Sequence, residues 1–210
     1  HAEIVGTEKT GQVHFLFTGS HQSLTSFFNA VKPTLLKETE AITKNMRQRG
    51  GGILAIELLD STKNMANYYQ LHVRFETADA MGANFINSCL EQLAQTLQNE
   101  AANYPHFSKT EKQIEVVMSI LSNYVPGSRV KAWVSCPIAE LGDDGDVLAK
   151  KFVQAVEIAH HNAYRAVTHN KGIMNGVDAL AIATGNDFRA VEAGIHAYAA
   201  KDGNYRGLSK

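Results

Sequence analysis

The densest group of polar side chains that could bind a ligand lies in residues 165–175. Arg165, Thr168, Lys171 and Asn175 stand there between two runs of apolar residues with helical spacing. An arginine can bind a carboxylate through two parallel hydrogen bonds, and a lysine ammonium can polarise a carbonyl group. Polar groups between apolar helices are costly unless they are hydrogen-bonded. The segment therefore predicts either a ligand site or a polar loop that caps the adjoining helix ends.

A carboxylate that could act with Lys171 stands at Asp187, directly before the last run of residues with helical spacing. Such an aspartate is either a helix N-cap or the acidic partner of a nearby lysine. A carboxylate close to a lysine keeps that lysine protonated. We expect the chain to reverse direction after Gly185 and to bring the two side chains close together.

Two shorter segments have the composition of anion-binding turns. Residues 79–84 include Asp79, Met81, Gly82 and Asn84 at an expected helix start, with Asp79 as the N-cap. Backbone N–H groups at such a start can bind an anion, and the same residues also suit a capped, tightly packed helix. The glycines at 50–52 either allow a ligand to approach the backbone or simply end a helix.

Composition excludes several other classes of protein. With 44% apolar residues, 20% charged residues and a net charge of -1, the chain has neither the composition of a disordered protein nor the basic excess of a nucleic-acid binder. It contains no apolar run long enough to span a membrane and no export signal. Cys89 and Cys136 lie in apolar stretches, so we expect two buried free thiols and a cytoplasmic protein. His160, His161 and His169 lack metal-ligand spacing, and no metal site is predicted.

The pattern of apolar residues predicts a mixed α+β fold. Strands are expected at 12–18, 53–59 and 68–75, and helices are expected from Pro33 to the glycine run and from Asp79 to about residue 103. Residues 113–121 fit a strand or a helix, and their alternation favours a strand. The resulting order, β-α-β-β-α-β, is that of a ferredoxin-like unit. A further strand at 129–136 could pair with the first residues of the chain, and the remainder is mostly helical.

Four segments together resemble a known enzyme family. Residues 166–200, AVTHNKGIMNGVDALAIATGNDFRAVEAGIHAYAA, closely resemble the bacterial, soluble class of 3-hydroxy-3-methylglutaryl-coenzyme A (HMG-CoA) reductases. Residues 79–84, DAMGAN, are similar to the cofactor motif of that family. The glycine run and residues 120–123, ILSN, are also similar and fall in the expected order. The resemblance extends over essentially the whole chain.

The resemblance implies a fold, a reaction and a set of site residues. It implies a ferredoxin-like NAD(P)-binding domain, at residues 10–125, inserted into a larger, partly helical substrate-binding domain that includes 1–9 and 126–210. It implies reduction of HMG-CoA to mevalonate with NADPH or NADH, or the reverse oxidation, by a homodimer or higher homo-oligomer. By position, the catalytic residues are Lys171 and Asp187, the substrate-binding residues are Arg165, Thr168 and Asn175, and the cofactor-binding residues are Asp79, Met81, Gly82, Asn84 and Asn123.

The chain also departs from the family pattern. No stretch matches the family segments that carry the catalytic glutamate and the catalytic histidine, so the chain alone is expected to be inactive. Many members carry an aspartate three residues after the last glycine, where this chain has Ala55, which favours NADP over NAD. The alternative from another class is a non-catalytic ferredoxin-like regulatory module that binds a small molecule. Residues 165–187 argue against it, because a sensing domain has no need of them.

Overall fold

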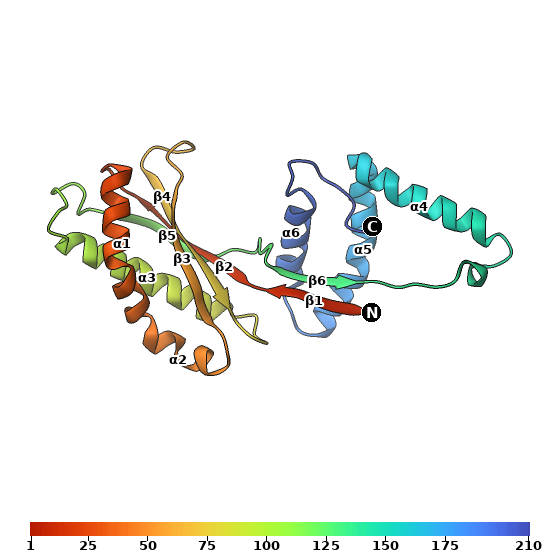
Figure 1. Cartoon of the computed structure of the whole chain (residues 1–210), viewed down its shortest axis with the longest axis horizontal. Coiled ribbons are helices and arrows are strands. Elements are labelled where there is room, and N and C mark those ends of the chain that lie inside the picture. The colour runs from red at the N-terminus through yellow and green to blue at the C-terminus, as the bar shows by residue number, and fades with distance from the viewer. The chain divides into compact units, whose positions relative to one another are not determined.

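The computed structural model describes residues 1–210, which form two compact units (Figure 1). One unit comprises residues 6–128, and the other comprises residues 1–5 and 129–210. The fold is mixed α+β with two separate sheets, as expected from the sequence. No helix is both long and apolar enough to cross a membrane.

The unit of residues 6–128 is built on a four-stranded antiparallel sheet. Its elements follow in the order β2 (Lys9–Leu16), α1 (His21–Glu38), α2 (Glu40–Gln48), β3 (Gly52–Asp60), β4 (Tyr68–Glu76), α3 (Ala83–Asn103) and β5 (Glu115–Leu121). The strands lie in the order β3-β4-β2-β5. Apart from the short α2, this is the predicted order of elements, and residues 113–121 do contain a strand.

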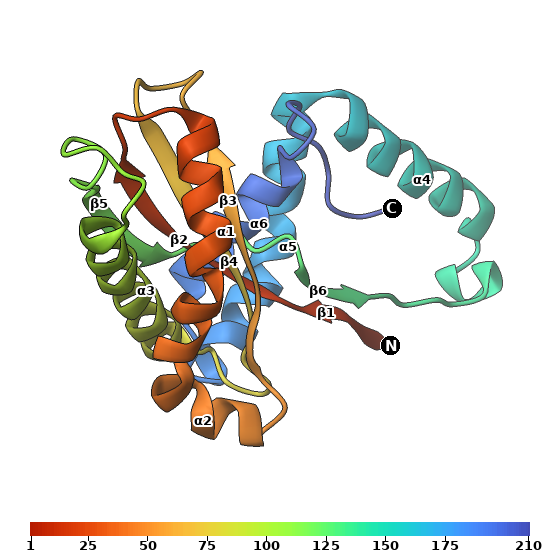
Figure 2. The same ribbon diagram turned by 60° about the vertical axis from the view of Figure 1, so that its left-hand side comes forward.

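The alternating pattern of the strands places the core on one face of the sheet. On β4, Leu71, Val73 and Phe75 are fully buried, while the residues between them are partly exposed. Helices α1 and α3 cover this face (Figure 2) and bury the apolar stripes that the sequence indicates. The other face carries polar pairs, such as Gln12 Nε2 donating to Gln70 Oε1 at 2.7 Å. Such a division is usual for an antiparallel sheet with one packed face.

Helix α1 begins twelve residues earlier than the sequence indicates, since His21 rather than Pro33 is its first residue. Ser20 is the N-cap and accepts a hydrogen bond from the Ser23 N–H at 3.0 Å. Pro33 therefore lies inside the helix, although it cannot donate a backbone hydrogen bond there. Burial of Leu24, Phe27, Phe28, Val31 and Leu35 against the sheet offsets this cost.

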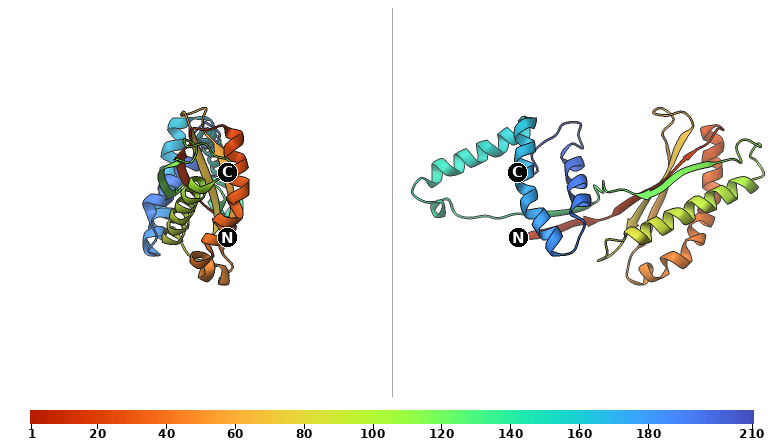
Figure 3. Two further views of the ribbon diagram at one scale, coloured as in Figure 1. Left: turned by 90° about the vertical axis from the view of Figure 1, so that its left-hand side faces the viewer. Right: turned by 180° about the vertical axis from the view of Figure 1, so that it is seen from behind.

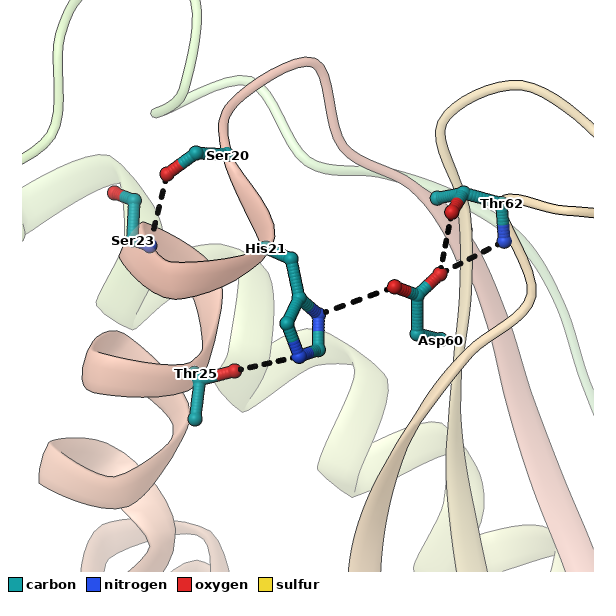
Figure 4. Close-up of polar contacts among 6 residues, drawn as sticks. All are labelled: Ser20, His21, Ser23, Thr25, Asp60 and Thr62. Atoms are coloured by element: carbon teal, nitrogen blue, oxygen red, sulfur yellow. Dashed lines mark hydrogen bonds and ion pairs between the residues drawn. The ribbon is translucent and has the colours of Figure 1, made fainter.

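Polar contacts tie the first turn of α1 to the end of β3 (Figure 4). The His21 ring lies between Thr25, at 3.3 Å, and the Asp60 carboxylate, at 3.4 Å. Asp60 also accepts from the backbone N–H and the hydroxyl of Thr62, which lowers the pKa of its carboxyl group. These contacts lie at the end of β3 that is opposite the glycine run.

The unit of residues 1–5 and 129–210 is a short ribbon followed by helices. β1 (Ala2–Thr7) pairs with β6 (Ser128–Ala132) in a two-stranded sheet, as expected from the sequence, and the two strands run side by side in Figure 3. The helical elements that follow are the 3₁₀ helix η1 (Ile138–Leu141), α4 (Gly145–His161), α5 (Ala163–Ala183) and α6 (Phe188–Ala199).

Helix α5 runs through the segment that the sequence indicates to be a junction between two helices. The break lies earlier, at Asn162, whose side chain accepts a hydrogen bond from the Arg165 N–H at 3.0 Å. Gly172 and Gly176 are accommodated within the helix, with open space beside each of them. An isolated glycine lowers helix stability but does not end a helix, and the prediction of a polar loop at 165–175 is therefore wrong.

Two of the polar residues in this segment hold the end of the chain. Asn170 is fully buried, its Nδ2 donates to the Arg206 carbonyl at 2.8 Å, and its Oδ1 accepts from the Leu208 N–H at 2.9 Å. The His169 ring contacts the Ser209 hydroxyl. Because these groups are satisfied within the fold, His169 and Asn170 have a structural role.

Close backbone packing explains the need for one glycine of the run at 50–52. A Cβ on Gly51 would lie 2.5 Å from the Glu76 carbonyl oxygen and 2.8 Å from Met46 Cγ. We predict that Gly51→Ala lowers the free energy of unfolding by about 1–3 kcal/mol through overpacking. Gly172→Ala, at an open helical position, should instead raise it by about 0.5–1 kcal/mol. Urea unfolding of both variants tests this, and equal effects would contradict the packing argument.

The contacts of Asn170 predict a local change in amide exchange. In Asn170→Ala the Leu208 N–H loses its acceptor, and hydrogen exchange at Leu208 should become much faster. Asn175→Ala is the matched control because Asn175 is exposed on the same helix and should leave Leu208 protected. Unchanged protection of Leu208 in Asn170→Ala would show that the segment is held by other contacts.

Candidate functional site

Three of the sequence segments proposed to bind a ligand lie at one end of the four-stranded sheet. Gly52, the first residue of β3, is paired with Glu76, the last residue of β4. Leu121, the last residue of β5, is paired with Gly11 near the start of β2. The antiparallel register therefore brings the glycine run, the loop after β4 and residue 123 to the same end of the sheet, where α3 also begins.

The loop between β4 and α3 leaves the start of α3 without a side-chain cap. Gly82 is the N-cap, with φ +79°, and a Cβ there would lie 2.4 Å from Thr77 Cγ2. The first hydrogen bond of the helix runs from the Ile86 N–H to the Gly82 carbonyl at 2.9 Å. The N–H groups of the first turn before Ile86 have no partner within the helix, and such groups favour an anion.

Asp79 is not the helix N-cap that the sequence indicates. The left-handed turn at Gly82 starts the helix three residues later, and no side chain caps it. The Asp79 carboxylate instead forms an ion pair with the Arg49 guanidinium, which lowers the pKa of the carboxyl group. Arg49 was not identified from the sequence, although its position directly before three glycines could have indicated a phosphate contact.

The other residues expected to bind a cofactor are exposed at this end of the sheet. The Met81 side chain is 52% exposed within the loop, and Asn84 is exposed in the first turn of α3. Asn123 is exposed just after β5. Hydrogen bonds from the Leu121 N–H to Asn87 Oδ1 at 3.0 Å and from the Ser122 N–H to the Thr10 carbonyl at 2.8 Å fix the chain before it.

The residues expected to bind substrate lie together on α5, in the other unit. Thr168, Lys171 and Asn175 have the spacing i, i+3 and i+7, so they share one helix face, and all three are exposed. Arg165 is exposed one turn before Thr168. Asp178 shares the face of Lys171, and its Oδ1 atom is buried without a hydrogen-bond partner.

The expected ion pair between Lys171 and Asp187 is not formed within the chain. Asp187 is the N-cap of α6 and accepts from the Arg189 N–H at 3.1 Å and the Ala190 N–H at 3.4 Å. These bonds to the helix start lower the pKa of its carboxyl group, and the guanidinium of Arg189, with Nε at 3.3 Å, lowers it further. Asp187 also borders a hollow of about 420 Å³ formed by residues 185–189.

The length of α5 explains why the two residues do not meet. The Asn186 N–H donates to the Ala181 carbonyl at 2.8 Å, which fixes the start of α6 beside Ala181. Lys171 lies ten residues before Ala181 on the same helix, a separation of about 15 Å along the axis. The sequence pattern predicts Lys171 at a helix end, whereas it lies within an uninterrupted helix.

Comparison with known proteins gives one consistent family. The sequence model of the hydroxymethylglutaryl-coenzyme A reductase family matches residues 1–209. The chain is 34% identical over 200 residues to a probable 3-hydroxy-3-methylglutaryl-coenzyme A reductase from Borreliella burgdorferi, covering 93% of this chain and 43% of that protein. It is 32% identical over 188 residues to the corresponding reductase from Archaeoglobus fulgidus, covering 86% of this chain and 40% of that protein.

Solved structures agree with this result. A reductase structure from Streptococcus pneumoniae matches with a TM-score of 0.78 and 33% identity, over 99% of this chain and 47% of that one. A class II reductase from the same organism, described as bound to NADPH in open conformations, matches with a TM-score of 0.79 and 33% identity, over 99% of this chain and 54% of that one. The chain spans less than half the length of the curated relatives it matches. It belongs to the hydroxymethylglutaryl-coenzyme A reductase family.

Proposed function

We propose that the chain forms the cofactor-binding unit and part of the substrate-binding unit of an NAD(P)H-dependent HMG-CoA reductase. The reaction is reduction of HMG-CoA to mevalonate, or the reverse oxidation, in isoprenoid metabolism. The observation that carries this proposal is the gathering of the glycine run, the loop 77–82 and Asn123 at one end of a sheet. This arrangement occurs in a chain that the family model matches over residues 1–209.

The unit of residues 6–128 is, on this proposal, a ferredoxin-like dinucleotide-binding domain. Its element order and the sheet order β3-β4-β2-β5, with the first and third strands of the unit in the centre, support that assignment. The open first turn of α3 would face the negatively charged part of the cofactor. The site would be lined by Met81, Gly82, Asn84 and Asn123. Asp79 would contribute indirectly, through its ion pair with Arg49. The NADPH bound by the related class II reductase supports the choice of cofactor.

The exposed face of α5 is the proposed substrate surface. Arg165, Thr168 and Asn175 would bind the hydroxymethylglutaryl group, because a guanidinium, a hydroxyl and an amide can satisfy its carboxylate and hydroxyl oxygens. The Lys171 ammonium would stabilise the oxyanion that develops on the thioester carbonyl. The nicotinamide, when bound, supplies the hydride.

Lys171 lies about 15 Å along α5 from Ala181, beside which Asp187 is held, so it needs another source for an acidic partner. We infer a homodimer in which Asp187 of a second copy pairs with Lys171, because Asp187 of the same chain cannot reach it. In a two-fold dimer each copy would give one residue and receive the other, which makes two equivalent sites. The Asp187 carboxylate would then keep the Lys171 ammonium protonated.

A mixing experiment tests this arrangement in a complete reductase that carries the sequence. Lys171→Ala and Asp187→Asn should each lower kcat by about 10²–10³ with a modest change in KM. When the two inactive variants are combined in mixed dimers, one of the two sites in each mixed dimer is intact. Activity should therefore return to about a quarter of the unaltered value for random mixing. No recovery, with mixed dimers verified by mass spectrometry, would contradict a site shared between copies.

Position 55 supplies a prediction about cofactor preference. Ala55 is paired across the sheet with Arg74, which forms ion pairs with Glu8 at 3.1 Å and Glu57 at 3.6 Å. In a complete reductase, Ala55→Asp should raise the ratio of kcat/KM for NADH over NADPH, because a carboxylate accepts from ribose hydroxyls and repels a 2'-phosphate. Ala55→Asn is the uncharged control and should change the ratio less. If Ala55→Asp and the unaltered enzyme have the same ratio, the residue at position 55 does not determine cofactor preference.

The cysteines are consistent with a cytoplasmic location, which we also propose. Both are free, and burial raises the pKa of the Cys89 thiol to about 12. Cys136 is exposed rather than buried as the apolar stretch around it indicates, because it lies in the extended segment after β6. An exposed free thiol persists most readily in a reducing compartment.

A further inference from the structure

The ion pair between Arg49 and Asp79 has the properties of a contact that a ligand can replace. Its side chains are 50% and 84% exposed, respectively. An exposed ion pair of this kind contributes little to stability. It joins the end of α2 to the loop before α3, and the adjacent Gly50 has open space where a side chain would be.

The neighbouring charges favour an anion at this position. The other nearby carboxylate, Glu76, is already bound by the Thr7 hydroxyl and the Ala78 N–H. Arg47, in the last turn of α2, is near Gly52, where a Cβ would lie 3.1 Å from its Cγ. The open N–H groups of α3 start in the same loop as Asp79. Asp79 is thus the carboxylate that neutralises Arg49.

We propose that Arg49 binds a phosphate group of the dinucleotide and that Asp79 holds its guanidinium in place until the phosphate arrives. A guanidinium can bind two phosphate oxygens at once. Arg49 contacts only one oxygen of Asp79, so a phosphate could form more hydrogen bonds with it than Asp79 does. Asp79 acts here as a positioning residue, because its carboxylate would act through the Arg49 guanidinium and would not contact the phosphate, which has the same sign of charge. This inference rests on the proposed cofactor function and names a residue that the family resemblance did not supply.

The test is to measure by calorimetry the affinity of the 210-residue chain for NADPH and, separately, for NADH. Arg49→Ala should weaken binding by roughly ten- to a hundredfold, the effect of losing charged hydrogen bonds. The affinity of Arg49→Lys should lie between that of the unaltered chain and that of Arg49→Ala, because a lysine keeps the charge but cannot form two parallel hydrogen bonds to phosphate. Lys109→Gln, which removes one positive charge before the start of β5 at the other end of the sheet, should bind as the unaltered chain does.

The two cofactors distinguish the two phosphate sources. A loss confined to NADPH assigns Arg49 to the 2'-phosphate, and an equal loss for both assigns it to the pyrophosphate. The double variant Arg49→Ala/Asp79→Asn tests whether the loss arises merely from an unpaired Asp79 carboxylate, and it should remain weak. Recovery of full affinity in the double variant, or normal binding by Arg49→Ala, would overturn the inference alone. Binding of neither cofactor by the unaltered chain would overturn the cofactor assignment as well.

Discussion

The close approach of Gly51 to the Glu76 carbonyl is the constraint on which the candidate cofactor site depends. With no side chain between them, the turn after α2 lies directly against the end of β4. That contact brings Arg49 to Asp79 and leaves the start of α3 beside both. A larger residue at position 51 would move the turn outward and separate the positive charge from the helix start.

A second constraint is the continuity of α5. Because no proline interrupts residues 163–183, the helix extends across the polar segment and divides its side chains between two faces. Asn170 turns inward and holds the end of the chain, while Thr168, Lys171 and Asn175 face outward. The same continuity separates Lys171 from Asp187 by a distance that neither side chain can span. A single helix thus places the three exposed residues on one face and, at the same time, keeps Lys171 apart from Asp187.

Both units combine residues that serve the fold with residues that remain available for a ligand. His169 and Asn170 adjoin Lys171 in sequence, yet their hydrogen bonds are used within the structure. Asp79 belongs to a segment similar to a cofactor motif, yet its observed partner is a protein side chain. In each case the residue type indicates a polar contact, and only the direction of the side chain in space decides between a structural and a binding role.

Periodicity and residue type in the sequence alone indicated the mixed α+β class and, apart from the short α2, the order of strands and helices in residues 9–121. These features follow from local patterns, because burial on one face imposes a period of two on strands and 3.6 on helices. Tertiary structure decided the rest. Burial of an apolar stripe allows α1 to continue through Pro33. The left-handed conformation of Gly82 makes α3 begin after Asp79, and the uninterrupted α5 separates Lys171 from Asp187. The first of these outcomes depends on contacts between residues distant in sequence, and the other two depend on backbone conformations that residue type and periodicity alone do not specify.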